Sequence, residues 1–191
     1  MRIVAGTWRG RGLVAPSGLT TRPTSDRVRQ VVFDMLWHAP WAGRAAVERA
    51  RVLDGFAGTG AMGLEALSRG AAEAVFMERD RAALAVLREN ISACRAEAVC
   101  QVLAVDALAP PAGAPCGLVF LDPPYSQGLA VRAALALALA GWLAPAALVV
   151  VETGRDETLE LPGERLAERA HGAARMTFWR LGGMDAVSHL R

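Results

Sequence analysis

The tetrapeptide Asp122-Pro123-Pro124-Tyr125 combines residue types that could act on an amino group carried by an aromatic ring. Its prolines fix the backbone and remove two N–H donors, which leaves the Pro123 carbonyl as an acceptor beside the Asp122 carboxylate. Two acceptors can hold both N–H groups of an exocyclic amine and favour a pyramidal nitrogen with an available lone pair. Asp122 could accept the departing proton, and Tyr125 could stack on a base. We predict Asp122, Pro123 and Tyr125 as catalytic; the alternative is a plain turn.

A glycine-rich loop supplies a candidate cofactor site. It runs Asp54-Gly55-Phe56-Ala57-Gly58-Thr59-Gly60-Ala61-Met62-Gly63 and matches G-x-G-x-x-G, a motif that dinucleotide enzymes share. Asp54 argues against a dinucleotide as the ligand, because a carboxylate just before the loop would repel a pyrophosphate. It suits a ligand with cationic groups and no phosphate, and S-adenosylmethionine carries an ammonium and a sulfonium. We therefore predict S-adenosylmethionine as the cofactor.

Two more acids end the next apolar runs. Glu78 could accept hydrogen bonds from ribose hydroxyls, and Asp106 could accept one from an adenine amino group. Each acid alone is typical of a turn at a strand end. Together with Asp54 they form a constellation at the edge where open α/β sheets bind ligands. The predicted cofactor set also includes Phe56, Gly58, Gly60, Arg79 and Ala107.

Apolar runs alternate with helical patterns along the chain, and the strands and helices that they predict would position the acids and the tetrapeptide. Runs without polar alternation predict strands buried on both faces, at residues 52–53, 74–77, 99–105, 118–121 and 148–151. Helices are predicted between them, one from about residue 61 to Gly70 and one that buries Leu84, Leu87 and Ile91. The tail 175–181 predicts an antiparallel hairpin at the sheet edge. The expected fold class is α/β, a doubly wound, mostly parallel, seven-stranded Rossmann-like methyltransferase sheet.

The N-terminal segment differs from this body. Residues 1–23 suggest a small hairpin or extended arm, and a helix follows Pro23 with Thr24 or Ser25 as its N-cap. We predict a basic arm over residues 1–40 and a methyltransferase domain over 41–191. Such an arm suits a phosphate backbone, although solvated arginines are the alternative. Against one acid, Asp26, its first thirty residues carry Arg2, Arg9, Arg11, Arg22, Arg27 and Arg29.

The composition favours a single-domain protein and argues against disulfide-rich, metal-binding, membrane-spanning and secreted classes. The chain has 191 residues, 53% of them hydrophobic, which favours one domain with a small appendage. Three scattered cysteines and three scattered histidines predict no disulfide framework and no metal site. Residues 133–151 are uncharged, but Gly141 and Pro145 divide them, so we interpret them as a helix and a strand rather than a membrane span. No secretory leader is expected, and the predicted location is the cytoplasm.

The motifs together resemble the RsmD family, bacterial enzymes that methylate N2 of a guanine in small-subunit (16S) ribosomal RNA. The resemblance covers residues 1 to about 155, and it rests on segments 2–11, 21–29, 53–60 and 122–125. It implies cofactor binding by Asp54, Gly58, Glu78 and Asp106 and guanine binding by Asp122 and Tyr125. The sequence departs from the family at Gly55, where a cysteine or another small residue is usual, and in the tail 182–191.

The resemblance also implies partners and roles for the arm. The stretch Arg22-Pro23-Thr24 and Arg27 would close over the cofactor or touch RNA. The RNA-binding prediction is Arg9, Arg11, Arg22 and Arg27, with Thr24 at the cofactor. The expected partner is small-subunit ribosomal RNA or the 30S ribosomal particle, and the enzyme is expected to be a monomer.

Three rival functions stay open from the sequence. A DNA or RNA adenine-N6 methyltransferase, or a protein-glutamine methyltransferase, would use the same tetrapeptide. The basic arm favours nucleic acid, and the short chain without a separate target-recognition domain favours structured RNA. An NAD-dependent oxidoreductase would need a hydride-transfer site, and a non-catalytic RNA-binding module would not need Asp54 and Asp122.

Overall fold

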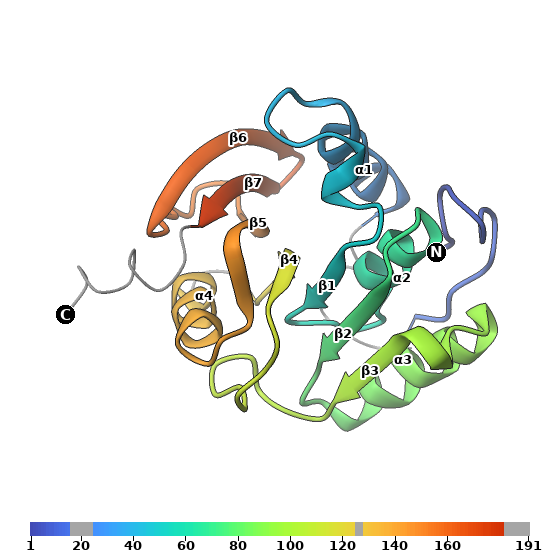
Figure 1. The fold of residues 1–191 in the computed structure, drawn as a ribbon. Coiled ribbons are helices and arrows are strands. Elements are labelled where there is room, and N and C mark those ends of the chain that lie inside the picture. Colours follow the sequence, from blue (N-terminus) through green and yellow to red (C-terminus); the bar gives the residue numbers. More distant parts are fainter. Residues whose placement is uncertain (16–24, 125–127, 182–191) are drawn as a thin grey trace.

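The computed structural model describes residues 1–15, 25–124 and 128–181, which form one sheet with helices on both faces (Figure 1). The strands are β1 (Arg51–Asp54), β2 (Glu73–Met77), β3 (Cys100–Leu103), β4 (Cys116–Leu121), β5 (Leu143–Gly154), β6 (Gly163–His171) and β7 (Ala174–Leu181). The helices are α1 (Asp26–His38), α2 (Ala61–Ser68), α3 (Arg81–Cys94) and α4 (Leu129–Leu139), with short 3-10 turns at Arg44–Ala46 and Glu97–Val99.

The sheet has seven strands in the order β3-β2-β1-β4-β5-β7-β6. The first five strands are parallel to their neighbours, whereas β7 is antiparallel to both β5 and β6. Parallel neighbours bring their carboxyl ends to one edge, so β1, β2, β3 and β4 all end on the same side of the sheet. The predicted doubly wound, mostly parallel, seven-stranded α/β sheet is confirmed.

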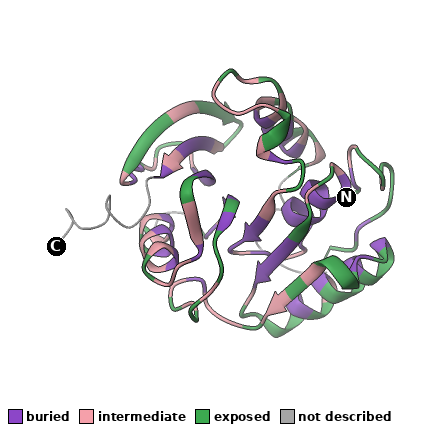
Figure 2. Ribbon diagram, viewed as in Figure 1, coloured by how far each residue is buried: buried purple, intermediate pink, exposed green. Residues whose placement is uncertain are grey.

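Each face of the sheet packs against a separate hydrophobic core. Phe76 and Phe120 point to the face that α1, α2, α3 and the N-terminal arm cover. Their strand neighbours Val75 and Leu121 point to the opposite face, against α4 and Trp142. Because both faces are covered, the central strands are buried along nearly their whole length (Figure 2). This burial explains why they appear in the sequence as unbroken apolar runs.

The N-terminal segment folds as expected where the structure describes it. Ile3 donates a backbone hydrogen bond to Arg11, and Gly10 donates one to Ile3, which closes a small hairpin. The Ser25 side chain accepts from the backbone N–H of Val28 and caps α1, as one of the two predicted N-caps. Ile3 is completely buried in the core of the main sheet, so the hairpin packs onto the body.

The structure corrects several element boundaries. The third strand spans Cys100–Leu103 rather than 99–105, and the fifth extends to Leu143–Gly154. The tail hairpin is antiparallel as predicted, but β7 lies inside the sheet and the unpredicted β6 forms the edge. The sequence did not predict β6, because this mostly exposed strand contains several charged residues and does not alternate between apolar and polar residues.

The apolar stretch 133–151 divides as predicted. Its first part completes α4, Gly141 makes the turn at a φ of 83°, and the remainder enters β5. Within the described residues, no helix is long and apolar enough to cross a membrane.

Candidate active site

Asp54 ends β1 and is the most deeply buried acid at the carboxyl edge. Its side chain is 3% exposed, and its Oδ2 accepts a hydrogen bond from the backbone N–H of Gly63 at 3.1 Å. Burial raises the pKa of Asp54 to about 7; the Gly63 N–H opposes that rise, and the negative charge of Glu78 adds to it. Among the described residues, no ion pair supplies Asp54 with a cation. The site therefore contains a buried carboxylate whose counter-charge a cationic ligand would supply.

Glu78 follows β2 and holds two loops together. Its Oε2 accepts from the backbone N–H of Gly58 at 2.8 Å, which ties the glycine-rich loop to the adjacent strand. Its Oε1 accepts from the N–H groups of Arg79 and Asp80, both at 2.8 Å, which fixes the turn into α3. The carboxylate thus lies beside the glycine-rich loop, as a contact to a cofactor ribose requires.

The three motif glycines meet different surroundings. A Cβ on Gly60 would lie 2.3 Å from Leu87, and one on Gly63 would lie 2.4 Å from Phe76, so both allow the loop and α2 to pack closely. A Cβ on Gly58 would meet nothing within 4 Å, although its φ of 51° still disfavours a side chain. Open space beside the loop therefore lies at Gly58, where a ligand can approach the backbone.

Asp106 lies beyond β3, and Arg79 pairs with it. The guanidinium of Arg79 binds Asp106 Oδ2 at 2.6 Å, and Asp106 Oδ1 accepts from the backbone N–H of Leu108 at 2.9 Å. Ala107 is buried, and Phe56 packs against the same core from the glycine-rich loop. The predicted cofactor residues after β1, β2 and β3 are thus brought to one edge of the sheet.

The residues fit S-adenosylmethionine on structural grounds. The buried Asp54 carboxylate suits the ammonium group, and the open backbone at Gly58 leaves room for the methionine moiety. Glu78 and Asp106 extend along neighbouring strand ends, in the order that ribose and adenine would follow. No group of three or more metal-ligating side chains occurs among the described residues.

The predicted catalytic tetrapeptide begins next to Asp54. The backbone N–H of Gly55 donates to the carbonyl of Phe120 at 2.9 Å, which joins the end of β1 to the end of β4. Asp122 follows β4 half-buried, and Pro123 is buried behind it. Tyr125, Arg22 and Thr24 lie outside the described residues, so their predicted roles stay predictions.

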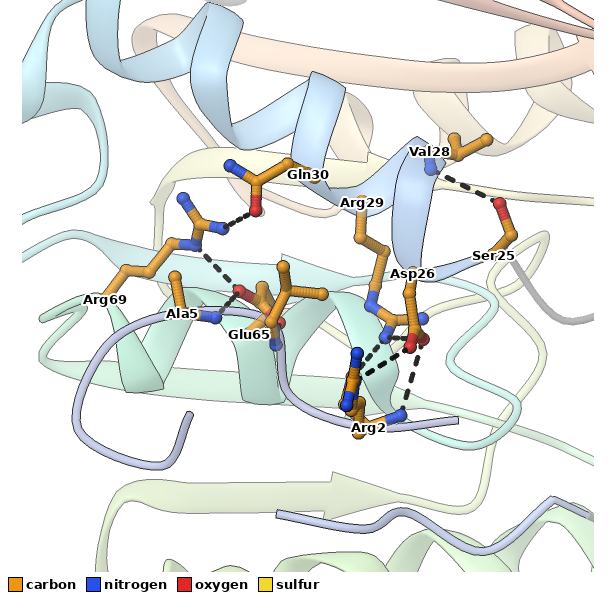
Figure 3. Close-up of polar contacts among 10 residues, drawn as sticks. Arg2, Ala5, Ser25, Asp26, Val28, Arg29, Gln30, Glu65 and Arg69 are labelled. Carbon is orange, nitrogen blue, oxygen red and sulfur yellow. Dashed lines mark hydrogen bonds and ion pairs between the residues drawn. The ribbon is translucent and has the colours of Figure 1, made fainter. Parts of the chain in front are cut away.

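The arm is held to the body by buried charges (Figure 3). Glu65 of α2 is fully buried, accepts from the backbone N–H groups of Val4 and Ala5, and pairs with Arg69 at 2.8 Å. Arg29 of α1 is also fully buried; it pairs with Asp26 at 2.7 Å and donates to the carbonyl of Arg2. The charge of Arg29, which the sequence analysis counted in the basic arm, is therefore used within the fold.

Other arm arginines stay at the surface. Arg9 and Arg27 are exposed, as are Arg2 and Arg11. Arg11 also donates from Nη1 to the carbonyl of Ala93 at the end of α3, which fixes the hairpin against that helix. Binding of RNA by Arg9, Arg11 and Arg27 stays a prediction.

Sequence reasoning missed Asn90 and Glu65. Asn90 is fully buried on α3; its Nδ2 donates to the carbonyls of Thr59 and Val14 at 2.9 and 3.0 Å, and its Oδ1 accepts from the Val14 N–H at 2.7 Å. It therefore connects the glycine-rich loop to the arm. Glu65 could have been recognised from the sequence, because an acid inside the apolar helix AMGLEALS requires buried partners.

Replacing Glu78 by Ala is expected to weaken S-adenosylmethionine binding about ten- to a hundredfold, the range of a lost charge-assisted contact. Glu78→Gln should show part of this loss, since an amide has one acceptor oxygen for contacts that now use two. Titration calorimetry measures the effect. The matched control is Glu73→Gln, an exposed acid at the opposite end of β2. An unchanged dissociation constant for Glu78→Ala would place the ribose contact elsewhere.

Comparisons with known proteins agree with this geometry. Residues 1–180 match the model of the family described as Conserved hypothetical protein 95. The Ribosomal RNA small subunit methyltransferase D of Haemophilus influenzae is 39% identical over 168 residues, covering 85% of this chain and 83% of that protein. The solved yhhF structure from Escherichia coli superposes with a TM-score of 0.81 at 35% identity, over 96% of this chain and 99% of that one. An RNA methyltransferase structure from Salinibacter ruber, in complex with S-adenosyl-L-homocysteine, shares the fold at 16% identity and a TM-score of 0.63, over 84% and 94% of the two chains.

Proposed function

Because this chain belongs to the family described as Conserved hypothetical protein 95, we propose that it transfers a methyl group from S-adenosylmethionine to small-subunit (16S) ribosomal RNA. The main observation behind the proposal is that β1 and β4 are hydrogen-bonded neighbours that end side by side. Asp54, a buried carboxylate suited to the cofactor, ends β1, and Asp122 follows the hydrogen-bonded neighbour β4. The proposed cofactor and substrate groups would therefore meet at one place on the carboxyl edge.

The acceptor we propose is the exocyclic N2 amino group of one guanine. When bound, S-adenosylmethionine supplies a methyl group on a positively charged sulfur. Asp122 and the Pro123 carbonyl would hold the two N–H groups of the amine, so that its lone pair is directed at that methyl group. As the new N–C bond forms, the methyl–sulfur bond would break and leave a neutral thioether, and the nitrogen would lose a proton that Asp122 can accept. Tyr125 would stack on the extruded base.

Rival acceptors share this chemistry. Adenine-N6 in DNA or RNA and a protein glutamine each present a planar nitrogen with two N–H groups to the same acceptors. The rRNA methyltransferase relative favours RNA. A nicotinamide dinucleotide is disfavoured, since its pyrophosphate would approach the buried carboxylate of Asp54.

Tritium transfer from labelled S-adenosylmethionine tests the proposal. The purified enzyme is incubated with 16S ribosomal RNA, and separately with small subunits, from a strain that lacks the gene, and the RNA is digested to nucleosides. We expect label in N2-methylguanosine alone, at about one methyl group for each RNA molecule. Label in N6-methyladenosine would overturn the choice of base, and label in glutamine of the ribosomal proteins would overturn the choice of RNA.

The remaining assignments are proposals of the same kind. Residues 1–40 would contact RNA and cover the cofactor through Arg9, Arg11, Arg22, Arg27 and Thr24, and residues 41–191 would carry out methyl transfer. The substrate would be the ribosomal RNA or the 30S particle, and the enzyme would act as a monomer in the cytoplasm.

A further inference from the structure

One face of α3 carries a row of exposed arginines. Arg81 begins the helix, Arg88 follows seven residues later, and Arg95 caps the helix after another seven. Seven residues make almost two helical turns, so Arg81 and Arg88 lie on nearly the same side of α3, about 10 Å apart along its axis, and Arg95 follows at the C-cap in a left-handed conformation. We call Arg81, Arg88 and Arg95 the α3 stripe. The exposed residues between these arginines are mostly small: Ala82, Ala85, Ser92 and Ala93.

The α3 stripe differs electrostatically from the arginines that form ion pairs within the fold. Ion pairs bind Arg29, Arg44, Arg51, Arg69, Arg79, Arg165, Arg175 and Arg180 to acidic side chains, and Arg2 also approaches one. Across residues 1–15, 25–124 and 128–181, no acid lies within ion-pair distance of any stripe arginine. The acids nearest in sequence are Asp80, whose side chain caps α3, and the exposed Glu89 and Glu97. The stripe charges are therefore available to a partner.

The α3 stripe connects two parts of the proposed RNA site. Arg81 lies just beyond Glu78 at the carboxyl edge, and α3 runs from there back toward the arm (Figure 1). At the far end, the arm residue Arg11 donates to the carbonyl of Ala93, next to Arg95. The row of positive charge thus extends from the arm to the cofactor edge without interruption by an ion pair.

We propose that the α3 stripe binds the phosphate backbone of the RNA substrate and guides it from the arm to the methylation site. This inference rests on the proposed function, because it takes RNA as the substrate. Phosphodiesters fit the observations: a guanidinium binds phosphate oxygens in a bidentate manner, and the small residues between the arginines let a backbone approach closely. The roughly 10 Å spacing would place Arg81 and Arg88 on different phosphates of the same strand.

The experiment replaces all three stripe arginines with Gln, which keeps helix propensity and removes three charges. Its matched control replaces Arg44, Arg49 and Arg165 with Gln, which removes the same charge from exposed positions away from the carboxyl edge. The probe is deproteinised 16S ribosomal RNA from a strain lacking the gene, with affinity measured by filter binding from 0.05 to 1 M KCl. S-adenosylmethionine affinity and circular dichroism confirm that each variant is folded.

For the stripe variant we expect the log–log salt slope of RNA affinity to flatten by about 2, since each single-strand phosphate contact contributes about 0.7. Affinity should be about a hundredfold lower at 0.1 M salt and should converge with that of the unmodified protein near 1 M. The KM for RNA should rise while kcat at saturating RNA stays unchanged. The control triple variant should keep both the slope and the KM.

Two different failures can be told apart. Equal slopes for the stripe variant and the control variant, in a protein that still methylates RNA, would overturn the α3 stripe as an RNA track. Absence of RNA methylation by the unmodified protein would overturn the proposed function itself. A loss of kcat with unchanged KM for RNA would also overturn the track, because it would assign the arginines to the chemical step.

Discussion

Asp54→Asn is expected to abolish cofactor binding and, at the same time, to stabilise the unliganded protein at neutral pH. The pKa of Asp54 rises from 3.8 to about 7 because the side chain is buried. A shift of about 3 units corresponds to roughly 4 kcal/mol of unfolding free energy. That stability is present in full below pH 3.8 and is lost as pH rises through 7, where the folded state must bury the carboxylate in its charged form.

The Asn variant should lack this loss. At pH 8 its free energy of unfolding should exceed that of the unmodified protein by up to about 4 kcal/mol, and the difference should vanish near pH 4. Urea unfolding at a series of pH values measures it. Its S-adenosylmethionine affinity should fall at least about a hundredfold, because the ammonium loses its counter-charge. Equal stability at pH 8 would mean that Asp54 is solvated, and normal affinity would remove it from the cofactor site.

The dissociation constant of S-adenosylmethionine for the unmodified protein should depend on pH with the same pKa of about 7. Binding to the charged carboxylate requires Asp54 to be ionised, so below pH 7 each unit of acidification should raise the dissociation constant about tenfold. Between pH 7 and 8 the dissociation constant should be nearly constant. A flat profile from pH 5.5 to 8 in calorimetry would show that ionisation of Asp54 is not linked to the ligand.

Asp122→Ala should reduce turnover by at least about a hundredfold and leave S-adenosylmethionine affinity nearly unchanged. The expected loss is the usual size of an acid–base contribution. Asp122 is half-buried in the loop after β4, and it takes no part in the Asp54–Gly63 hydrogen bond that supports the cofactor loop. Single-turnover methylation of 16S ribosomal RNA measures the chemical step, and calorimetry measures the cofactor affinity.

Two further variants sharpen this test. Asp122→Asn keeps an acceptor oxygen but no longer takes a proton, so it should retain more activity than the Ala variant if holding the amine is the main role. Asp156→Ala removes an exposed acid after β5 and should turn over normally. Near-normal methylation by Asp122→Ala would exclude the proposed mechanism.

The sequence alone determined the order of the elements from α1 to β5 and the acids that follow the strands. Strands buried on both faces must be continuously apolar, so β1, β2 and β4 could be located, with small errors at β3 and β5. Ser25 was identifiable as a cap because capping is local to one helical turn. Placing Asp54, Glu78 and Asp122 at one edge followed from the parallel order alone, since parallel strands end together.

Only the tertiary structure decided which charges are free and which are used within the fold. Arg29 and Arg9 look equivalent in the sequence, yet Arg29 is fully buried against Asp26 and Arg9 is exposed. The link that Asn90 makes between Thr59 and Val14 spans distant segments, and no local pattern encodes it. Burial and ion pairing depend on which parts of the chain meet in space. The raised pKa of Asp54 and the unpaired α3 stripe are therefore properties of the folded chain.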